Sequence, residues 1–214
     1  MISYNGVYPE VRRIRINMKV SSLLERLEYT CCQGSVEQEV STVEYDSRKV
    51  IENSLFICIK GAVVDGHKFV PDVVAKGAKT LVVQDDVEAP QDVTVIKVED
   101  TRYAMAFISA AYFGHPAEQL KTIGITGTKG KTTTTYMVKS ILENAGYKVG
   151  LIGTIEAIIG DEVIPAANTT PESFVVQKYR TRSYRTERAQ RFRTLSCLQI
   201  HASPPVQSRH RKPR

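Results

Sequence analysis

The chain has 214 residues, of which 42% are hydrophobic, and a formal net charge of +6. That length can bury one large or two small hydrophobic cores. The longest apolar run, residues 103–113, suits a buried helix and is too short to cross a bilayer, and no secretory signal pattern opens the chain. The four cysteines, Cys31, Cys32, Cys58 and Cys197, lack zinc-ligand spacing and indicate free thiols in a reducing compartment. We therefore expect a cytoplasmic protein with no membrane partner.

The positive charge is concentrated at the end of the chain. Residues 1–178 contain 19 Lys and Arg and 22 Asp and Glu, a net charge of −3, whereas residues 179–214 carry a net charge of +9. This last segment has few large aliphatic side chains and no sustained helix or strand period, so we expect a disordered Arg-rich tail. Phosphate neutralisation could give it weak affinity for nucleic acid, but few aromatic residues are interleaved. We therefore expect no specific nucleic-acid partner.

The first part of the chain predicts a small α/β domain. Residues 1–17 have little pattern, and because Met18 could be a start, we interpret them as an N-terminal extension. Short apolar runs predict strands at 42–45, 54–59, 80–83 and 93–98 and helices at 20–27, 68–76 and 101–113. Asp100 is placed to cap the last of these helices. Alternating strands and helices indicate an α/β domain over residues 18–118, with its boundary at 115–118.

The most informative segment is residues 122–136. An apolar strand runs into Gly127-Thr128-Lys129-Gly130-Lys131-Thr132, where a helical pattern begins. Such glycines let backbone N–H groups point at a polyphosphate, and the N-terminus of the helix adds a favourable field. Lys131 can reach the β- and γ-phosphates, and the Thr132 hydroxyl suits Mg²⁺. Ile125 stands where the common G-x-x-x-x-G-K-[ST] spacing has its first glycine, so this is a variant loop. The alternative is a Gly-rich turn that binds nothing.

The α/β pattern continues for only a short distance beyond this loop. A helix over 131–145 is predicted, followed by a strand at 148–152 and a hairpin at 158–164. The apolar residues expected on the buried face of that helix are Met137, Val138, Ile141, Leu142 and Ala145. One β-α-β unit falls short of a nucleotide-binding sheet, which has about five strands. We therefore interpret residues 119–178 as the truncated start of a parallel-sheet ATP-binding domain.

Several ordered motifs in the chain resemble those of the Mur ligase family. Residues 124–134 resemble the ATP loop of the family, with Lys129 at a position where Asn is more common. The motifs that resemble its N-terminal domain are Asp46-Ser47-Arg48-Lys49-Val50, Leu55-Phe56, Lys60-Gly61, Asp65-Gly66-His67-Lys68-Phe69 and Lys76-Gly77-Ala78. The motifs that resemble its MurE type are Gly153-Thr154-Ile155 and Asn168-Thr169-Thr170-Pro171-Glu172-Ser173. The resemblance covers about residues 18–178.

This resemblance implies an ATP-dependent amide ligase of peptidoglycan precursor synthesis. In the family, ATP phosphorylates the free carboxylate of UDP-N-acetylmuramoyl-L-alanyl-D-glutamate, and the amino group of the incoming amino acid attacks the acyl phosphate. The implied cofactors are ATP and Mg²⁺, because phosphoryl transfer relies on positioning and charge neutralisation. The implied partners are the UDP-N-acetylmuramoyl dipeptide and an amino acid, and we expect a monomer.

The resemblance also implies three groups of site residues. The ATP phosphates would be held by Gly127, Thr128, Lys129, Gly130, Lys131, Thr132 and Thr133, with Lys131 catalytic and Thr132 binding the metal. The UDP-sugar would be bound by Tyr45, Ser47, Arg48, Ala62, Val63 and Val64. The muramoyl peptide would contact Asn168, Thr169 and Thr170. In each group the alternative is an ordinary turn, cap or linker residue, and for His67 we expect a solvated turn residue.

The chain departs from the family pattern at about Tyr179. The family continues with a metal-binding Glu, a His and a carbamylated Lys, and then with a C-terminal domain that selects the amino acid; this chain instead changes to Arg, Ser, Gln and Pro. We interpret it as a truncated, frameshifted ligase product that does not catalyse ligation. Two alternatives stay open at this point. One is a MurF-type fragment, and the other is a non-catalytic UDP-sugar-binding module whose basic tail binds nucleic acid.

Overall fold

In the computed structural model the chain divides into two compact units, Met1–Gly114 and His115–Arg214. The structure describes residues 17–61, 64–166, 170–186 and 192–197. The division falls at the start of the predicted boundary, residues 115–118. Within the described ranges no helix has both the length and the apolar character needed to cross a membrane. Cys31, Cys32 and Cys58 are free thiols, as predicted.

The first unit contains a five-stranded sheet in the order β2-β7-β6-β5-β4. Four strands run parallel, and β2 at one edge is antiparallel to β7. The strands are β2 (Thr30–Gln33), β4 (Thr42–Glu44), β5 (Ser54–Ile57), β6 (Ala78–Val83) and β7 (Thr94–Lys97). A separate pair is formed by β1 (Met18–Lys19) and β3 (Glu39–Val40). The helices are α1 (Val20–Leu23), the 3-10 turn η1 (Gly66–Phe69), α2 (Val70–Ala75) and α3 (Thr101–Tyr112).

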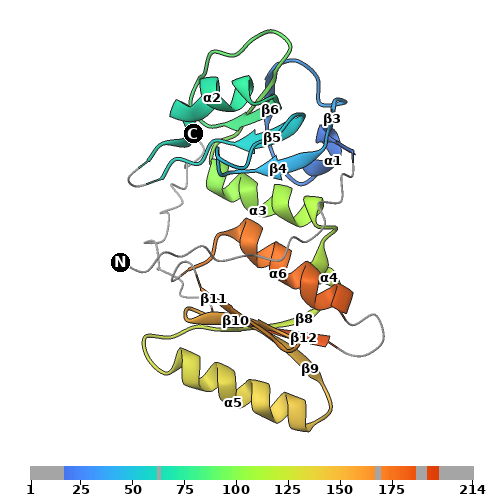
Figure 1. Ribbon diagram of the computed structural model, residues 1–214, viewed down its shortest axis with the longest axis vertical. Coiled ribbons are helices and arrows are strands. Elements are labelled where there is room, and N and C mark those ends of the chain that lie inside the picture. Colours follow the sequence, from blue (N-terminus) through green and yellow to red (C-terminus); the bar gives the residue numbers. More distant parts are fainter. Residues whose placement is uncertain (1–16, 62–63, 167–169, 187–191, 198–214) are drawn as a thin grey trace, which may run out of the picture. The chain divides into compact units, whose positions relative to one another are not determined.

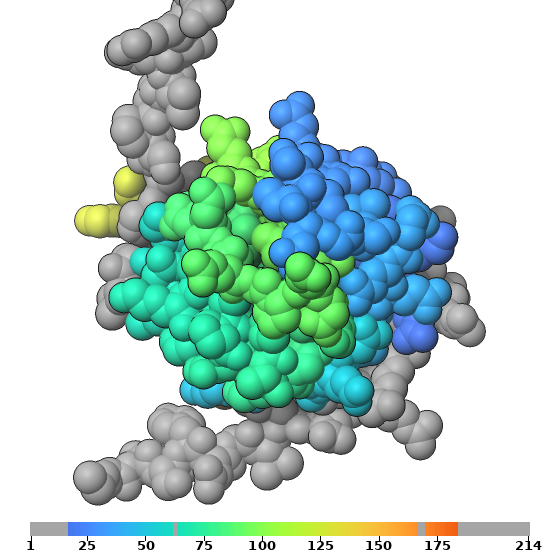
Figure 2. Space-filling view, turned by 90° about the horizontal axis from the view of Figure 1, so that it is seen from above, coloured from blue at the N-terminus to red at the C-terminus, as the bar shows by residue number. Residues whose placement is uncertain are grey.

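Helices cover both faces of this sheet (Figure 1). Alternate strand residues point to opposite faces, and Phe56 and Leu81 pack with Val70 and Val73 of α2 in one buried cluster. The strand neighbours of those residues point to the other face, where α3 lies. Asp100 caps α3 as predicted, since its carboxylate accepts the backbone N–H groups of two residues in the first turn. Figure 2 shows blue segments of this unit beside its later green segments, and α1 packs on α3.

The second unit contains another five-stranded sheet, in the order β11-β10-β9-β12-β8. Strands β8, β12 and β9 are parallel, and β10 and β11 form an antiparallel hairpin. The strands are β8 (Lys121–Ile125), β9 (Lys148–Ile152), β10 (Glu156–Ile159), β11 (Glu162–Pro165) and β12 (Phe192–Cys197), and the helices are α4 (Pro116–Gln119), α5 (Lys131–Asn144) and α6 (Ser173–Thr186). Helix α5 covers one face of the sheet and α6 covers the other (Figure 1). The predicted α/β class is confirmed in both units.

The predicted disorder from Tyr179 onward is wrong for two segments. Helix α6 continues through Tyr179 to Thr186, and residues 192–197 form β12 between β8 and β9. A strand in that place has hydrogen-bonding partners on both sides, so its tertiary context overrides a composition that does not favour a strand. The rest of the predicted tail, and residues 1–16 of the predicted extension, lie outside the described residues.

The predicted buried face of α5 is only partly correct. Val138 and Leu142 are half-buried, but Met137 is 61% and Ile141 is 66% exposed, and Ala145 is exposed just beyond the last turn. The fully buried position is Thr135. The less exposed side of α5 includes residues 131, 135, 138 and 142, which follow a helical spacing. Hydrophobicity alone did not reveal this side, because it includes Lys131 and Thr135.

Candidate functional site

The segment between β8 and α5 has the backbone geometry of an anion-binding loop. Gly127 and Gly130 have φ values of 153° and 75°, and Gly130 is the N-cap of α5. A Cβ atom at Gly130 would meet no atom within 4 Å, so glycine is required there for its left-handed backbone rather than for space. The first N–H groups of a helix have no partner within the helix, and together with the helix dipole they attract anions.

The predicted ATP-binding residues occupy this loop and the first turn of α5. The Lys131 ammonium donates a hydrogen bond to the Gly127 carbonyl at 2.6 Å, which holds it over the loop. Thr132 is half-buried, and the three residues 127–129 are exposed. These side chains include a cation for phosphate oxygens and a hydroxyl for a hard divalent cation. The residues therefore fit a nucleotide phosphate with Mg²⁺, while the role of each residue stays a prediction.

The phosphate-loop helix is tied to the segment after β9. The Tyr136 hydroxyl donates a hydrogen bond to the Glu156 carboxylate at the start of β10. This hydrogen bond, together with burial, raises the pKa of Tyr136 to about 12. Tyr136 and Glu156 line a shallow pocket with Thr132 and with residues 153–155. The sequence motif Gly153-Thr154-Ile155 therefore lies against the first turns of α5. The Tyr136–Glu156 pair was not predicted, because its members are 20 positions apart.

Ser47 lies in a tight turn after β4. Lys49 N donates to the Asp46 carbonyl at 2.9 Å, and Asp46 accepts two hydrogen bonds from the Arg48 guanidinium, both of 2.9 Å. These bonds hold the pKa of Asp46 at about 2. Tyr45 and Ser47 are half-buried and Arg48 is exposed. The guanidinium that was predicted to bind substrate is thus already paired with the carboxylate of its own turn.

The second predicted UDP-sugar segment follows β5. Gly61 N donates to the Val64 carbonyl at 3.0 Å, and Gly66 N donates to the Ile59 carbonyl at 2.8 Å. A Cβ at Gly66 would lie 2.7 Å from Ile59 N, so this close approach requires glycine. Val64 is 53% exposed. Two predicted residues of this segment, Ala62 and Val63, lie outside the described residues.

The structure describes little of the predicted muramoyl-peptide segment. Asn168 and Thr169 lie outside the described residues, and Thr170 is exposed before α6. The structure therefore describes the three predicted groups to different degrees. All seven positions of the predicted ATP-binding group are described, as are four of the six predicted UDP-sugar positions and one of the three predicted peptide positions.

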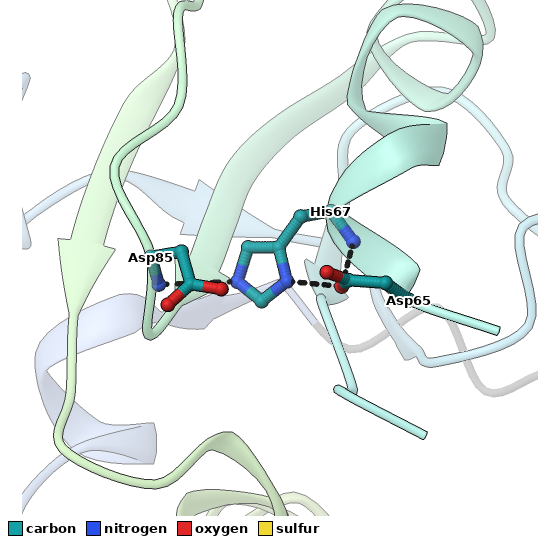
Figure 3. A group of neighbouring side chains, drawn as sticks. All are labelled: Asp65, His67 and Asp85. Atoms are coloured by element: carbon teal, nitrogen blue, oxygen red, sulfur yellow. Dashed lines mark hydrogen bonds and ion pairs between the residues drawn. The ribbon is translucent and has the colours of Figure 1, made fainter. Parts of the chain in front are cut away.

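His67 is a buried connector between two loops, which corrects the expected solvated turn residue (Figure 3). Its side chain is 8% exposed, and its Nδ1 lies 2.6 Å from Asp65 Oδ1. Its Nε2 accepts the backbone N–H groups of Gln84 at 3.1 Å and Asp85 at 3.3 Å. Because Nε2 is the acceptor, the ring proton of the neutral imidazole is on Nδ1 and is donated to Asp65.

The group Asp65, His67 and Asp85 has ligand atoms close enough together to suggest a metal centre. Both ring nitrogens of His67 are used by hydrogen bonds, to Asp65 and from the Asp85 backbone (Figure 3), so no imidazole lone pair is free for a metal. The Asp85 carboxylate also pairs with the Lys60 ammonium at 2.6 Å. This group is therefore a structural connection between the loop after β5 and the loop after β6.

Two family descriptions match this chain, one in each unit. Residues 39–113 match "Mur ligase family, catalytic domain", and residues 125–189 match "Mur ligase middle domain". Together these matches span well over half of the chain. The chain belongs to the Mur ligase family. The middle-domain match reaches residue 189, so the resemblance of this Mur ligase chain to its family extends further than the predicted limit at residue 178.

Its curated relatives carry the name UDP-N-acetylmuramoyl-L-alanyl-D-glutamate--2,6-diaminopimelate ligase. The chain is 52% identical over 157 residues to the protein from Clostridium perfringens, a match that covers 73% of this chain and 32% of that protein. It is 46% identical over 164 residues to the protein from Clostridium tetani, covering 75% of this chain and 34% of that protein. The Mur ligase chain thus spans about a third of the length of these relatives.

Solved structures of Mur ligases share its fold. A structure titled UDP-N-acetylmuramoyl-L-alanyl-D-glutamate--2,6-diaminopimelate ligase matches with a TM-score of 0.65 and 17% identity over 85% of this chain and 36% of that one. MurF from Acinetobacter baumannii matches with a TM-score of 0.56 and 23% identity, also over 85% of this chain and 36% of that one. At these identities the likeness concerns the fold alone and does not separate MurE from MurF.

Proposed function

We propose that this chain is the nucleotide-sugar-binding and ATP-binding portion of a MurE-type ligase, an ATP-dependent enzyme of peptidoglycan precursor synthesis. The main support is the glycine loop between β8 and α5. The chain that contains it is 52% identical, over 157 residues, to a relative named UDP-N-acetylmuramoyl-L-alanyl-D-glutamate--2,6-diaminopimelate ligase. The MurF type is less well supported, because its likeness is one of fold at 23% identity.

The proposed substrates are UDP-N-acetylmuramoyl-L-alanyl-D-glutamate and a diamino acid. The names of the relatives support 2,6-diaminopimelate as that amino acid. ATP supplies the phosphoryl group that activates the free carboxylate, which then forms an amide with the incoming amine. Because the 214 residues span about a third of the length of those relatives, the proposal concerns binding by these residues rather than turnover.

The proposed ATP site uses the backbone and two side chains of the α5 N-terminus. The N–H groups that follow Gly127 and Gly130 bind phosphate oxygens, and Lys131 neutralises their charge. The Thr132 hydroxyl is a ligand for Mg²⁺, which prefers oxygen donors. Phosphoryl transfer depends on such positioning and electrostatic stabilisation, so the contribution of this segment is to hold the nucleotide and its metal.

The proposed nucleotide-sugar site lies in the first unit, at the Ser47 turn and the segment around Val64. Ser47 is half-buried and carries a hydroxyl, and Tyr45 directly follows β4. The other proposed contacts of this site are Arg48, Ala62 and Val63. Asn168, Thr169 and Thr170, in the second unit, are proposed separately for the muramoyl-peptide portion of the substrate. The two nucleotide sites therefore belong to different units, and each can be tested by a substitution that leaves the other intact.

Titration calorimetry on the 214-residue protein tests both sites. Ser47→Ala should weaken binding of UDP-N-acetylmuramoyl-L-alanyl-D-glutamate about fivefold or more while leaving binding of a non-hydrolysable ATP analogue with Mg²⁺ unchanged, as expected for one lost hydrogen bond to a charged group. Lys131→Ala should weaken binding of the ATP analogue and leave binding of UDP-N-acetylmuramoyl-L-alanyl-D-glutamate unchanged. Lys139→Ala is the control for charge removal, because Lys139 lies on the same helix and pairs with Glu143.

Absence of nucleotide-sugar binding by the folded protein would refute the proposed function. Tighter binding of the UDP-N-acetylmuramoyl tripeptide than of the dipeptide would instead favour the MurF type. Loss of both ligands in either single variant would show that the substitution acts through folding, which far-UV circular dichroism of the same samples would reveal.

A further inference from the structure

The end of α2 is held against the segment that follows the Ser47 turn. Gly77 has a φ of +95°, and a Cβ there would lie 2.9 Å from the Cα of Glu52. Asn53 N donates to the Gly77 carbonyl at 2.8 Å. Both the backbone angle and the close approach require glycine. The contact fixes Lys76, the C-cap of α2, beside the loop that joins β4 to β5.

Lys76 reaches Ser47 from this position. Its ammonium donates a hydrogen bond to the Ser47 carbonyl at 2.8 Å, in an exposed setting. The two cations of the turn itself, Arg48 and Lys49, instead have a carboxylate as partner. Arg48 binds Asp46 through two nitrogens, and the Lys49 ammonium lies 3.6 Å from the same carboxylate. Within the described ranges, no carboxylate lies within ion-pair distance of Lys76. Of Lys76, Arg48 and Lys49, Lys76 is therefore the one whose hydrogen-bonding partner is neutral.

An ammonium held at the backbone carbonyl of Ser47, a residue that also carries a hydroxyl, complements a phosphate better than it complements a base or a sugar. The hydroxyl and the ammonium both donate to phosphate oxygens, and the ammonium also neutralises charge, which strengthens the hydrogen bond. A uracil ring or a ribose hydroxyl carries no charge for Lys76 to neutralise. The long lysine side chain can exchange its carbonyl acceptor for a phosphate oxygen by rotating about its own bonds.

We propose that Lys76 binds the diphosphate of the nucleotide-sugar, together with the hydroxyl of Ser47. This inference rests on the proposed function and adds a residue outside the Ser47 turn itself. It also ranks the cations: Lys76 contributes more to diphosphate affinity than Arg48, whose guanidinium is held by Asp46.

The experiment compares UDP, UMP and uridine by titration calorimetry on the 214-residue protein. Lys76→Met should lower the affinity for UDP about five- to tenfold, because a charge-assisted hydrogen bond to phosphate is lost. Its effect on uridine should be less than about twofold, and Lys76→Arg should keep most of the preference for UDP. Lys79→Met is the matched control, since Lys79 is on the adjacent β6 and its partner is Asp92 at 2.5 Å.

Two results would overturn the inference alone. One is a UDP affinity in Lys76→Met equal to that of the wild type, and the other is an equal loss for UDP and uridine, which would mean that Lys76 only shapes the turn. The salt dependence gives a second reading, because a lost phosphate contact reduces the fall of UDP affinity with added salt. A wild-type protein that is folded but binds no UDP would overturn the proposed function, and this inference with it.

Discussion

Replacing His67 with Phe tests whether one imidazole joins the two loops of the first unit. Phe has a similar size but no hydrogen-bonding atoms, so Asp65 loses a donor and two backbone N–H groups, of Gln84 and Asp85, lose their acceptor. An unsatisfied buried donor costs about 1–3 kcal/mol, and a hydrogen bond to a charged group contributes about 1.5–3 kcal/mol. Because the two N–H groups share one lone pair and Asp65 is 28% exposed, we expect a loss of about 2–3 kcal/mol in the free energy of unfolding.

Urea unfolding followed by circular dichroism measures the total loss, and hydrogen exchange locates it. The amides of Gln84 and Asp85 should exchange faster in His67→Phe, because each loses its acceptor. Lys60→Met is the control within the same pair of loops, since it breaks the ion pair with Asp85, whose two side chains are about half exposed. That exposed pair should contribute little to the free energy of unfolding. Two results would refute the assigned role of the imidazole. One is unchanged hydrogen exchange at residues 84 and 85 in His67→Phe, and the other is an equal loss in the free energy of unfolding in His67→Phe and Lys60→Met.

Three further predictions concern stability and titration. Asp46→Asn should destabilise the protein by about 1 kcal/mol at pH 7. The lowering of the Asp46 pKa from 3.8 to about 2 sets this magnitude, after a discount for the 86% exposure of its partner Arg48. Because the pKa is lowered, the stabilisation is complete above pH 4 and lost as the pH falls through 2, so the urea midpoints of the wild type and the variant should converge there. Gly77→Ala should cost about 2–3 kcal/mol by thermal unfolding, because φ is +95° and the new Cβ meets backbone. Tyr136→Phe should remove from the ultraviolet titration a phenol that ionises near pH 12. Because the pKa of Tyr136 is raised, its contribution to stability is present below pH 10 and lost as the pH rises through 12.

Local sequence pattern was sufficient for the elements whose causes are local. The strand, glycine turn and helix at residues 121–144 follow from an apolar run, two glycines and a helical period, and α3 follows from its Asp100 cap. Strand β12 could not be predicted in this way. Its residues form a strand because β8 and β9 offer hydrogen bonds on both sides, and that condition depends on parts of the chain far away in sequence.

The same limit applies to the site. The motif around Ser47 was visible as consecutive letters, whereas Lys76 lies 29 positions away and is brought to it by the contact of Gly77 with Glu52. His67 resembled a solvated residue because it follows Asp65 and Gly66, two common turn formers. Its partners at residues 84 and 85 are 17 and 18 positions away, so no local pattern could reveal that it is buried.

The position of β12 has a consequence for how the protein is made. The first unit has all five strands of its sheet by Lys97, so it can close while the ribosome is still producing the second unit. In the second unit, β8 and β9 are not neighbours, and each pairs with β12. Domains fold as their segments emerge, and long-range parallel pairing is slow. The loop at residues 127–130 therefore lacks a complete supporting sheet until β12, which ends at Cys197, has been synthesised. A nascent chain arrested before β12 should therefore hold a folded first unit and a protease-sensitive loop at residues 127–130.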